Sequence, residues 1–381
     1  MTHISASSKT DEHNDSENHV LRPAFRIGKN DGEPCRRILD ELGLLDHSCK
    51  PFAENFFLYF PLLRSPEKEE RLKISQLIGN KIFVSQNRPV FLMPYLQDIS
   101  FQTQKKSLTV FEILGFSIAY EIIGDIAVID DKIAEDKNDS AEPDISSSIS
   151  KIADAILTAH PSVKTVLLST GPISGEFRTR PLKFIAGVNK TDTVHKEYGC
   201  KYKVDLQRAY FTPRLSTERH RILPQIQKDD VVIDMFAGVG PYSIMIAKNA
   251  SPKCVVANDK NAEAVALLRE NLILNKAANV TALNEDALFL SEKYPKTGDH
   301  VIMNLPHNAF DFLDTAVSIC KHGGVIHYYA MTSEDDLFDG SIELIRKAAE
   351  KQNRDIEIVE KRNVRSYAPH QFNICLDVRI L

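Results

Sequence analysis

The chain has 381 residues, of which 43% are hydrophobic and 26% are charged, and its formal net charge is -5 at pH 7. These values exclude a wholly disordered or fibrous protein and predict two or three globular domains. No apolar run approaches the ~18 residues of a membrane span, and the N-terminus lacks the apolar core of a secretory signal. The six cysteines show no C-x-x-C pair and no zinc-binding spacing with histidine. We therefore expect free thiols, a cytoplasmic protein and no metal site.

The first 95 residues contain a polar tail and a small module. Residues 1–21 are rich in Ser, Asn, Asp and Glu, and we predict a disordered tail there. Apolar residues from Cys35 to Leu45 recur at helical spacing, and the aromatic run FFLYFPL at 56–62 indicates a buried strand. These elements predict a small α+β module over 22–95.

A linker is predicted over 96–110, followed by a middle α+β domain over 111–225. The segment 111–130 looks like paired strands with Gly115 and Gly124 at turns or bulges. Between Asp125 and Asp144, eight Asp and Glu residues stand against two Lys. After this acidic stretch, ISKIADAILTAH predicts a helix and KTVLLST a strand.

The sign of the charge then reverses. From Glu176 to Lys228 there are twelve Lys and Arg residues against five Asp and Glu, interleaved with aromatic residues. A run of charge is often only a solvated surface. Local positive potential is nevertheless what a polyphosphate ligand requires, whatever the net charge of the whole chain.

Residues 226–381 alternate between strand-like and helix-like segments. VVIDMF, CVVAND, NVTALNED and HVIMN predict strands, and GPYSIMIAK and the segment 261–275 predict helices. Such alternation predicts a parallel sheet covered by helices. The last 26 residues read as two strands that pair antiparallel, which is more typical of methyltransferases than of nicotinamide dehydrogenases.

Acidic and glycine residues at the predicted strand ends indicate a cofactor site. Asp234 ends the first strand, and Gly238 and Gly240 form a turn in which backbone N–H groups can approach a ligand closely. Asp259 follows the second strand, where an acid accepts hydrogen bonds from ribose hydroxyls, and Asp286 follows the third. Ser243 stands where a dinucleotide fingerprint has its third glycine, so adenosine without a pyrophosphate fits better than NAD. The leading cofactor is S-adenosylmethionine.

The fourth strand ends in the tripeptide Asn304-Leu305-Pro306. It resembles the tetrads of amino-methyltransferases, in which a side chain and a backbone carbonyl grip a planar nitrogen. An ordinary turn stopped by proline is the alternative. The neighbouring cofactor pattern on the same sheet edge favours the functional interpretation.

In their order and spacing, several segments resemble the archaeal–eukaryotic tRNA (guanine-37-N1) methyltransferases. The segments are DGEPCRRILDELGLL, GPISGEFRTRPLKFIAG, TVHKEYGCKYKVDL, FTPRLSTERHRI, VVIDMFAGVGPYS, NDKNAEAVALLRENLILNK, NLPHNAFDFLDTA, GGVIHYY and VRSYAP. The resemblance covers about 22–381. It implies a C-terminal Rossmann-type methyltransferase domain over 226–381, a middle domain and a small N-terminal module that recognises tRNA.

The resemblance also implies S-adenosylmethionine as cofactor and tRNA with guanosine at position 37 as partner. N1 of guanine carries a proton, so its methylation requires a base and a donor that stabilises negative charge on O6. Glu218 is the predicted base, and salt bridges to Arg214 and Arg219 are the alternative role of its carboxylate. The family pattern places Arg178 at O6, Asn304 at the base edge and Pro306 in the pocket wall. The predicted phosphate contacts are Arg180, Arg214 and Arg219. The predicted cofactor residues are Asp234, Phe236, Ala237, Gly238, Gly240, Asp259, Asn261, Asp286 and Asn304.

Other functions stay open at this point. The nearest is the aminocarboxypropyl transferase of wybutosine synthesis, which uses the same cofactor at the same tRNA position, or a bifunctional methyltransferase of that pathway. A silent RNA-binding protein conflicts with the presence of every proposed catalytic residue. A small-molecule methyltransferase would leave the basic stretch and the N-terminal module unexplained. We expect a monomer without membrane association.

Overall fold

The structure is a computed structural model that describes residues 19–78, 82–85, 88–91, 95–102, 108–130, 145–171 and 175–381. The chain divides into two compact units, Met1–Ser107 and Leu108–Leu381. Most of the predicted tail lies outside the described residues, and His19, Val20 and Leu21 belong to the first strand. The acidic stretch lies outside them from residue 131 to 144.

The first unit is an α+β module. Its antiparallel sheet has the order β2-β3-β1-β6, and a separate hairpin joins β4 to β5. Its elements are β1 (His19–Gly28), α1 (Gly32–Glu41), β2 (Phe52–Glu54), β3 (Phe57–Pro61), α2 (Lys68–Ile78), β4 (Ile82–Ser85), β5 (Arg88–Phe91) and β6 (Tyr95–Gln102). Phe25, Leu39 and Phe60 share its core. The predicted helix and strand are both present, although the helix ends before Leu42.

The second unit begins with α3 (Val110–Leu114), where a strand was predicted. This prediction was wrong because a capping box starts a helix here: Thr109 accepts from the backbone of Glu112, whose side chain accepts from the backbone of Thr109. Gly115 ends the helix with φ 79°, a left-handed conformation that favours glycine. The predicted hairpin turn at Gly124 joins β7 (Tyr120–Ile123) to β8 (Ile126–Ile129).

A four-stranded sheet follows, in the order β10-β9-β8-β7. The predicted helix and strand are α4 (Ile145–Ala159) and β9 (Thr165–Ser169), and β10 (Leu182–Gly187) pairs antiparallel with β9. The hairpin of β11 (Asp192–Glu197) and β12 (Cys200–Asp205) leads to α5 (Ser216–Ile222). Asn271 and Asn275 of the last domain bind the backbone of β12, which ties the hairpin to that domain.

The last part of the chain is the expected α/β domain. Its sheet has seven strands in the order β15-β14-β13-β16-β17-β19-β18, with the final hairpin antiparallel at one edge. The strands are β13 (Val231–Asp234), β14 (Cys254–Asn258), β15 (Val280–Leu283), β16 (Gly298–Met303), β17 (Cys320–Ser333), β18 (Ile356–Ala368) and β19 (Gln371–Ile380). The helices are α6 (Pro241–Asn249), α7 (Ala262–Asn275), α8 (Leu290–Lys293), α9 (Leu313–Ile319) and α10 (Asp339–Glu350).

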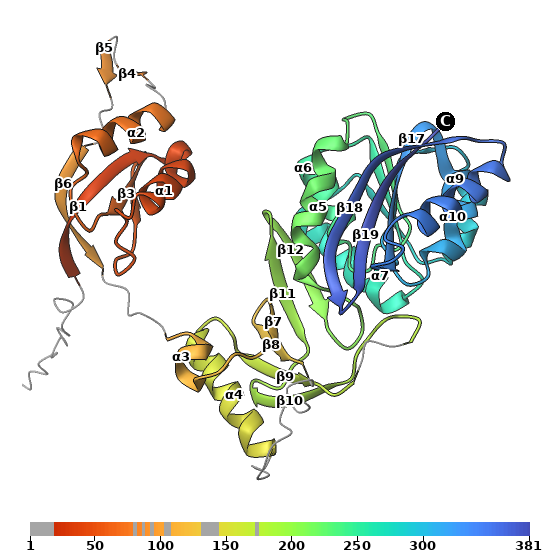
Figure 1. Cartoon of the computed structure of the whole chain (residues 1–381), viewed down its shortest axis with the longest axis horizontal. Helices are drawn as coiled ribbons and strands as arrows, with labels where there is room; N and C mark the ends of the chain where they lie inside the picture. Colours follow the sequence, from red (N-terminus) through yellow and green to blue (C-terminus); the bar gives the residue numbers. More distant parts are fainter. Residues whose placement is uncertain are drawn as a thin grey trace, which may run out of the picture. The chain divides into compact units, whose positions relative to one another are not determined.

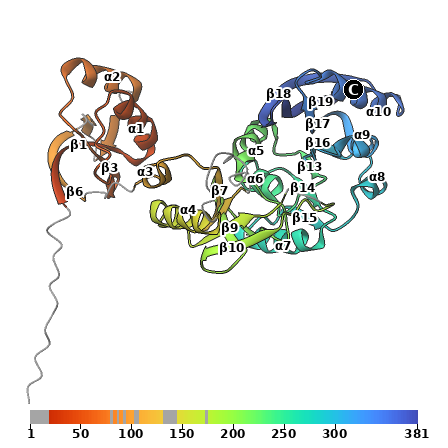
Figure 2. The same cartoon turned by 60° about the horizontal axis from the view of Figure 1, so that its bottom comes forward.

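Helices cover both faces of this sheet (Figures 1 and 2). Alternate strand residues separate the two sides: Tyr328 packs with α8, α9 and α10, whereas Tyr329 packs with the core around α6. The carboxyl ends of β13, β14 and β16 meet at one edge, which therefore gathers the side chains that follow each strand.

Candidate active site

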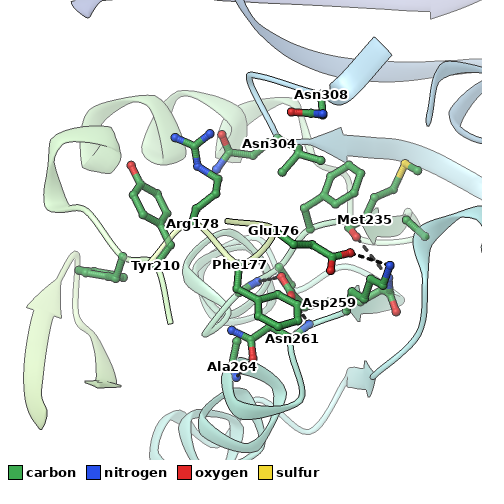
Figure 3. Close-up of a pocket in the computed structure, with 18 of the residues that line it drawn as sticks. Glu176, Phe177, Arg178, Tyr210, Met235, Asp259, Asn261, Ala264, Asn304 and Asn308 are labelled. Carbon is green, nitrogen blue, oxygen red and sulfur yellow. Dashed lines mark hydrogen bonds and ion pairs between the residues drawn. The ribbon is translucent and has the colours of Figure 1, made fainter. Parts of the chain in front are cut away.

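A cavity of about 500 Å³ opens at this sheet edge. Segments of the middle domain (175–178 and 210–212) form one wall, together with Leu215 and Arg219, and residues at or after the ends of β13, β14, β15 and β16 form most of the rest. In Figure 3, Arg178 and Asn304 lie on one side near Tyr210, and Asp259 and Asn261 lie on the other. The structure thus brings together eight of the predicted site residues around this cavity, and Arg219 also lines it. These eight are Arg178, Phe236, Ala237, Gly238, Asp259, Asn261, Asp286 and Asn304.

The turn after β13 has the conformation that glycine permits. Gly238 and Gly240 have φ of 55° and 90°, and a Cβ on Gly240 would lie 2.4 Å from Leu268 Cδ1. Gly240 does not line the cavity itself, so its contribution is to start α6 closely packed against α7. Gly238 lies at the cavity and donates its N–H to Asp259 Oδ2 at 2.7 Å.

Asp259 is held by the backbone on both of its oxygens. Its other oxygen accepts from the N–H of Asn261 at 2.8 Å, and burial raises its pKa. Each carboxylate oxygen retains a further lone pair, so hydroxyl groups of a ligand can still bind. The side chain of Asn261 caps α7 and donates to the carbonyl of Arg208, so its own contribution at the cavity is structural in this conformation.

Asp234 lies behind the cavity rather than in its wall. It is fully buried and accepts a hydrogen bond from Ser243 Oγ at 2.6 Å, while its Oδ1 has no partner among the described residues. Burial raises the pKa of Asp234 to about 7.

An ion-pair bridge that the sequence did not reveal crosses the side of the cavity that Asp286 lines. Lys260 Nζ lies 2.6 Å from Glu176 Oε1 and 3.1 Å from Asp286 Oδ2. The Leu288 N–H and Lys260 lower the pKa of Asp286. In the sequence, Lys260 could be placed near the cavity because it directly follows Asp259. Its pairing with Glu176 could not be predicted, because the two residues are 84 positions apart.

Arg178 and Asn304 present polar groups to the other half of the cavity. Arg178 has a left-handed backbone (φ 54°), and its Cζ lies 5.4 Å from the centroid of the Tyr210 ring. Left-handed conformations of this kind in large residues often mark functional sites. Asn304 Oδ1 is buried and has no partner in the described part of the chain, and Pro306 contributes its carbonyl to the Met331 N–H at 2.9 Å.

The three arginines predicted to bind phosphate differ in exposure and in the carboxylate that each one contacts. Arg180 and Arg214 both lie near Glu121, at 3.5 and 3.3 Å, and Arg214 is about half exposed. Arg219 is 2% exposed and forms a bidentate ion pair with Glu197, from Nε to Oε1 at 2.8 Å and from Nη2 to Oε2 at 2.5 Å. Arg219 is therefore a nearly buried residue of the cavity wall that pairs with Glu197, rather than an exposed phosphate contact.

Glu218 does not line the cavity, although its neighbours Leu215 and Arg219 do. Its carboxylate is 3% exposed and is held by Arg221, Arg362 and the hydroxyl of Tyr329. The expected partners Arg214 and Arg219 bind other carboxylates instead. Helix geometry explains the outcome for Arg219, because Arg221, three residues from Glu218, shares its face of the helix and the adjacent Arg219 does not. Arg214 lies before α5, in the turn Pro213–Leu215.

Two observations on the described residues bear on other functions. They contain no group of three His, Cys, Asp or Glu side chains that could hold a metal ion, and none of their helices has the length and apolarity to cross a membrane. None of the six cysteines forms a disulfide bond.

Three family models match the chain. The TRM5/TYW2 methyltransferase domain matches residues 193–359, the tRNA methyltransferase 5 N-terminal domain matches 24–70, and the TYW2 N-terminal domain matches 107–191. The tRNA (guanine(37)-N(1))-methyltransferase Trm5b of Pyrococcus abyssi is 38% identical over 357 residues, which are 94% of this chain and 98% of that protein. The chain belongs to the TRM5/TYW2 methyltransferase family.

Solved structures of the TRM5/TYW2 family agree. Trm5b from Pyrococcus abyssi has a TM-score of 0.63 at 34% identity and covers 94% of this chain and 99% of its own. A complex of aTrm5 with tRNALeu has a TM-score of 0.61 at 32% identity over 94% and 100% of the two chains. TYW2 of Methanocaldococcus jannaschii in complex with AdoMet has a TM-score of 0.53 at 28% identity, over 69% and 99%. The predicted family and fold class are therefore confirmed.

A second branch of the TRM5/TYW2 family matches less of the chain. The tRNA(Phe) (4-demethylwyosine(37)-C(7)) aminocarboxypropyltransferase of Methanocaldococcus jannaschii is 34% identical over 262 residues, 69% of this chain and 98% of that protein. A complete protein of that branch thus leaves about a third of this chain unmatched.

Proposed function

We propose that this protein transfers the methyl group of S-adenosylmethionine to N1 of guanosine 37 in tRNA. The observation that carries the proposal is the match to a methyltransferase of that name over 94% of this chain and 98% of the relative. The match to the tRNA methyltransferase 5 N-terminal domain at residues 24–70 supports it further.

The cavity fits the cofactor. Gly238 brings a backbone turn to the cavity wall, and Asp259 and Asp286 stand where ribose hydroxyls and an adenine amino group would donate hydrogen bonds. Asn304 Oδ1 is a buried acceptor without a partner in the described residues, which is costly unless a ligand supplies a donor. When bound, S-adenosylmethionine supplies a methyl group that its sulfonium already activates.

The substrate requires a base and a stabiliser of charge. During transfer the N1–methyl bond forms, the sulfur–methyl bond breaks and the N1 proton leaves guanine. Glu218 receives this proton in our proposal, and Arg178 stabilises the negative charge that moves onto O6. Asn304 holds the base edge, and Pro306 shapes the turn that carries Asn304.

The tRNA backbone would bind the basic side of the middle domain. Arg180 and Arg214 share the nearly buried Glu121 in this structure, so the more exposed Arg214 can bind a phosphate while Arg180 stays beside Glu121. We leave Arg219 out of this set because it is buried against Glu197.

The aminocarboxypropyl transfer reaction is the second candidate. Two observations favour it: the middle domain matches the TYW2 N-terminal model at 107–191, and a relative of that activity shares 34% identity. The same chain could also methylate a wybutosine intermediate, as the name of the 32% identical Taw21 of Saccharolobus solfataricus states for that protein.

A pair of tRNA transcripts that differ only in guanosine or adenosine at position 37 tests the proposal. With methyl-labelled S-adenosylmethionine, we expect label in the guanosine transcript and background in the other. Equal labelling would exclude position 37 as the target. Absence of methyl label, with transfer from cofactor labelled in the aminocarboxypropyl chain, would establish the second candidate.

We also propose a monomeric, cytoplasmic enzyme. Sedimentation equilibrium of the free protein and of its tRNA complex would test the monomer, and a dimer in either state would contradict it.

A further inference from the structure

A continuous chain of buried polar groups runs behind the catalytic candidate Glu218. Arg221 of α5 donates from Nε to Glu218 Oε1 at 2.9 Å. The same guanidinium donates two hydrogen bonds to Asp377 of β19, from Nη1 to Oδ2 at 2.6 Å and from Nη2 to Oδ1 at 3.1 Å. These groups lie on the face of the sheet that α5 and α6 cover, together with Tyr329.

Asp377 is itself fixed from the opposite side. His327 Nδ1 donates to Asp377 Oδ1 at 2.7 Å, and His327 Nε2 lies 3.0 Å from His300 Nδ1. His327 is fully buried, and burial lowers the pKa of His300 to about 4. Burial alone would raise the pKa of Asp377, but His327 and Arg221 outweigh it and lower that pKa well below its usual value. Asp377 is therefore a permanent anion that fixes the plane of the Arg221 guanidinium.

The two oxygens of Glu218 are held very differently. Oε1 receives hydrogen bonds from two buried donors, Arg221 Nε and the Tyr329 hydroxyl, both at 2.9 Å. Oε2 lies 3.1 Å from Arg362 Nε, but this nitrogen makes no aligned hydrogen bond to any described residue. The Arg362 side chain is 41% exposed, so it can move away at small cost.

We propose that Arg221, Asp377 and Tyr329 are positioning residues that hold Oε1 of Glu218, so that Oε2 is the oxygen that accepts the substrate proton after Arg362 moves aside. This inference rests on the proposed function, in which Glu218 is the base. Arg221 stays protonated and Asp377 never meets the substrate, so neither takes part in the proton transfer. They act by keeping one carboxylate oxygen fixed while the other is free to react.

A double-mutant cycle with single-turnover methyl transfer tests this inference. At saturating S-adenosylmethionine and tRNA, we expect Asp377→Asn to slow the reaction by about 10²-fold, the effect of a displaced catalytic group. In a Glu218→Gln background, which has no base to position, Asp377→Asn should cause no further loss. A protein with a merely structural Asp377 would lose the same factor in both backgrounds.

If Asp377→Asn does not fold, a less disruptive substitution, Tyr329→Phe, takes its place in the test. Tyr329→Phe keeps the ring and removes one donor to Oε1, and we expect a loss of about 10-fold in the wild-type background alone. Cofactor affinity, measured for every variant, should stay within about twofold of the wild-type value because none of these residues lines the cavity. Arg379→Gln, which breaks an exposed ion pair with Glu357 on the same hairpin, should react at the wild-type rate.

The outcomes separate this inference from the proposed function. If Glu218→Gln alone reacts at the wild-type rate, the base assignment and the positioning role both fail, while methyl transfer itself stands as the activity. If Glu218→Gln is slow but Asp377→Asn and Tyr329→Phe lose equal factors in both backgrounds, the base assignment stands and the positioning role is overturned.

Discussion

The two halves of the candidate site hold their carboxylates by opposite means. On the cofactor side, Asp259 is bound by backbone N–H groups of its own neighbourhood, and Asp234 accepts a hydrogen bond from the Ser243 hydroxyl. On the base side, the carboxylates are held by side chains: Arg221 of α5 binds both Glu218 and Asp377, Tyr329 of β17 binds Glu218, and His327 of β17 binds Asp377. Asp234 and Asp259 are thus held by neutral donors, whereas Glu218 and Asp377 are held in ion pairs. Asp286 of the cofactor half is the exception, because it pairs with Lys260.

The difference appears in the pKa of two buried acids. Burial raises the pKa of Asp234 to about 7, because no cation compensates the loss of water. Asp377 is equally buried, yet its ion pairs lower its pKa. Asp234 is therefore held by a neutral donor and has a raised pKa, whereas Asp377 is held in ion pairs and stays charged. The predictions below test that division.

The largest effect is expected for the base itself. Glu218→Gln preserves size and most hydrogen bonds but removes the proton acceptor, so we expect the single-turnover rate to fall about 10²–10⁴-fold. Affinity for cofactor and tRNA should change little. Glu357→Gln, the same change at an exposed position of β18, serves as control. A Glu218→Gln protein that methylates at the wild-type rate would move the base function to another group or to water.

The stability of the folded protein should report the raised pKa of Asp234. A folded-state pKa above the unfolded value of about 4 gives stability that is complete below pH 4 and is lost as the pH rises to about 7. We expect Asp234→Asn to remove this component, a few kcal/mol at most by the measure of about 1.4 kcal/mol per pKa unit. Denaturant melts of both proteins from pH 4 to 8 measure it. Parallel pH profiles would show that Asp234 does not titrate in this range.

Arg178 should affect the chemical step. Arg178→Ala removes the cation where O6 becomes negative, and the expected loss in single-turnover rate is about 10²–10³-fold, as for one donor of an oxyanion hole. Lys183→Ala on the neighbouring strand β10 removes an exposed cation and should leave the rate unchanged. If the variant loses tRNA affinity and keeps its rate, Arg178 binds phosphate instead.

Asp259 should affect cofactor binding without altering tRNA binding. We expect Asp259→Ala to weaken S-adenosylmethionine binding by about 1–3 kcal/mol, since ribose hydroxyls and two backbone N–H groups lose their acceptor. Calorimetry with cofactor and, separately, with tRNA distinguishes the two ligands. An unchanged dissociation constant for the cofactor would remove Asp259 from its site.

The smallest effect is expected at the exposed arginine Arg214. tRNA affinity should fall steeply with salt, because each phosphate contact releases counterions. Arg214→Ala should weaken binding by about 1 kcal/mol or less and reduce the salt slope by about one. Arg346→Ala, an equally exposed arginine of α10, is the control and should leave the slope unchanged. A flat salt response of the wild-type protein would make the basic stretch a solvated surface.

The same contrast explains what the sequence could predict. The residues gathered at the cofactor edge follow their own strands within a few positions, so local patterns identified Gly238, Asp259 and Asp286. Glu218 is held by Tyr329 directly and by Asp377 through Arg221. These two residues are 111 and 159 positions further along the chain and come near Glu218 only through the order of the strands. Helix spacing alone predicts Arg221 as a partner of Glu218, because the two residues are three positions apart. The adjacent Arg219 was predicted instead. One local pattern was also overlooked. Thr109 and Glu112 form a capping box that starts the helix α3, where a strand was predicted.

Nucleoside mass analysis tests the central claim most directly. tRNA with guanosine 37 is incubated with the protein and methyl-labelled S-adenosylmethionine, then digested to nucleosides after the position of the label is mapped. The account predicts one labelled product, 1-methylguanosine, derived from position 37. A guanosine labelled at another atom, a label at another position, or an aminocarboxypropyl adduct without the methyl label would contradict it.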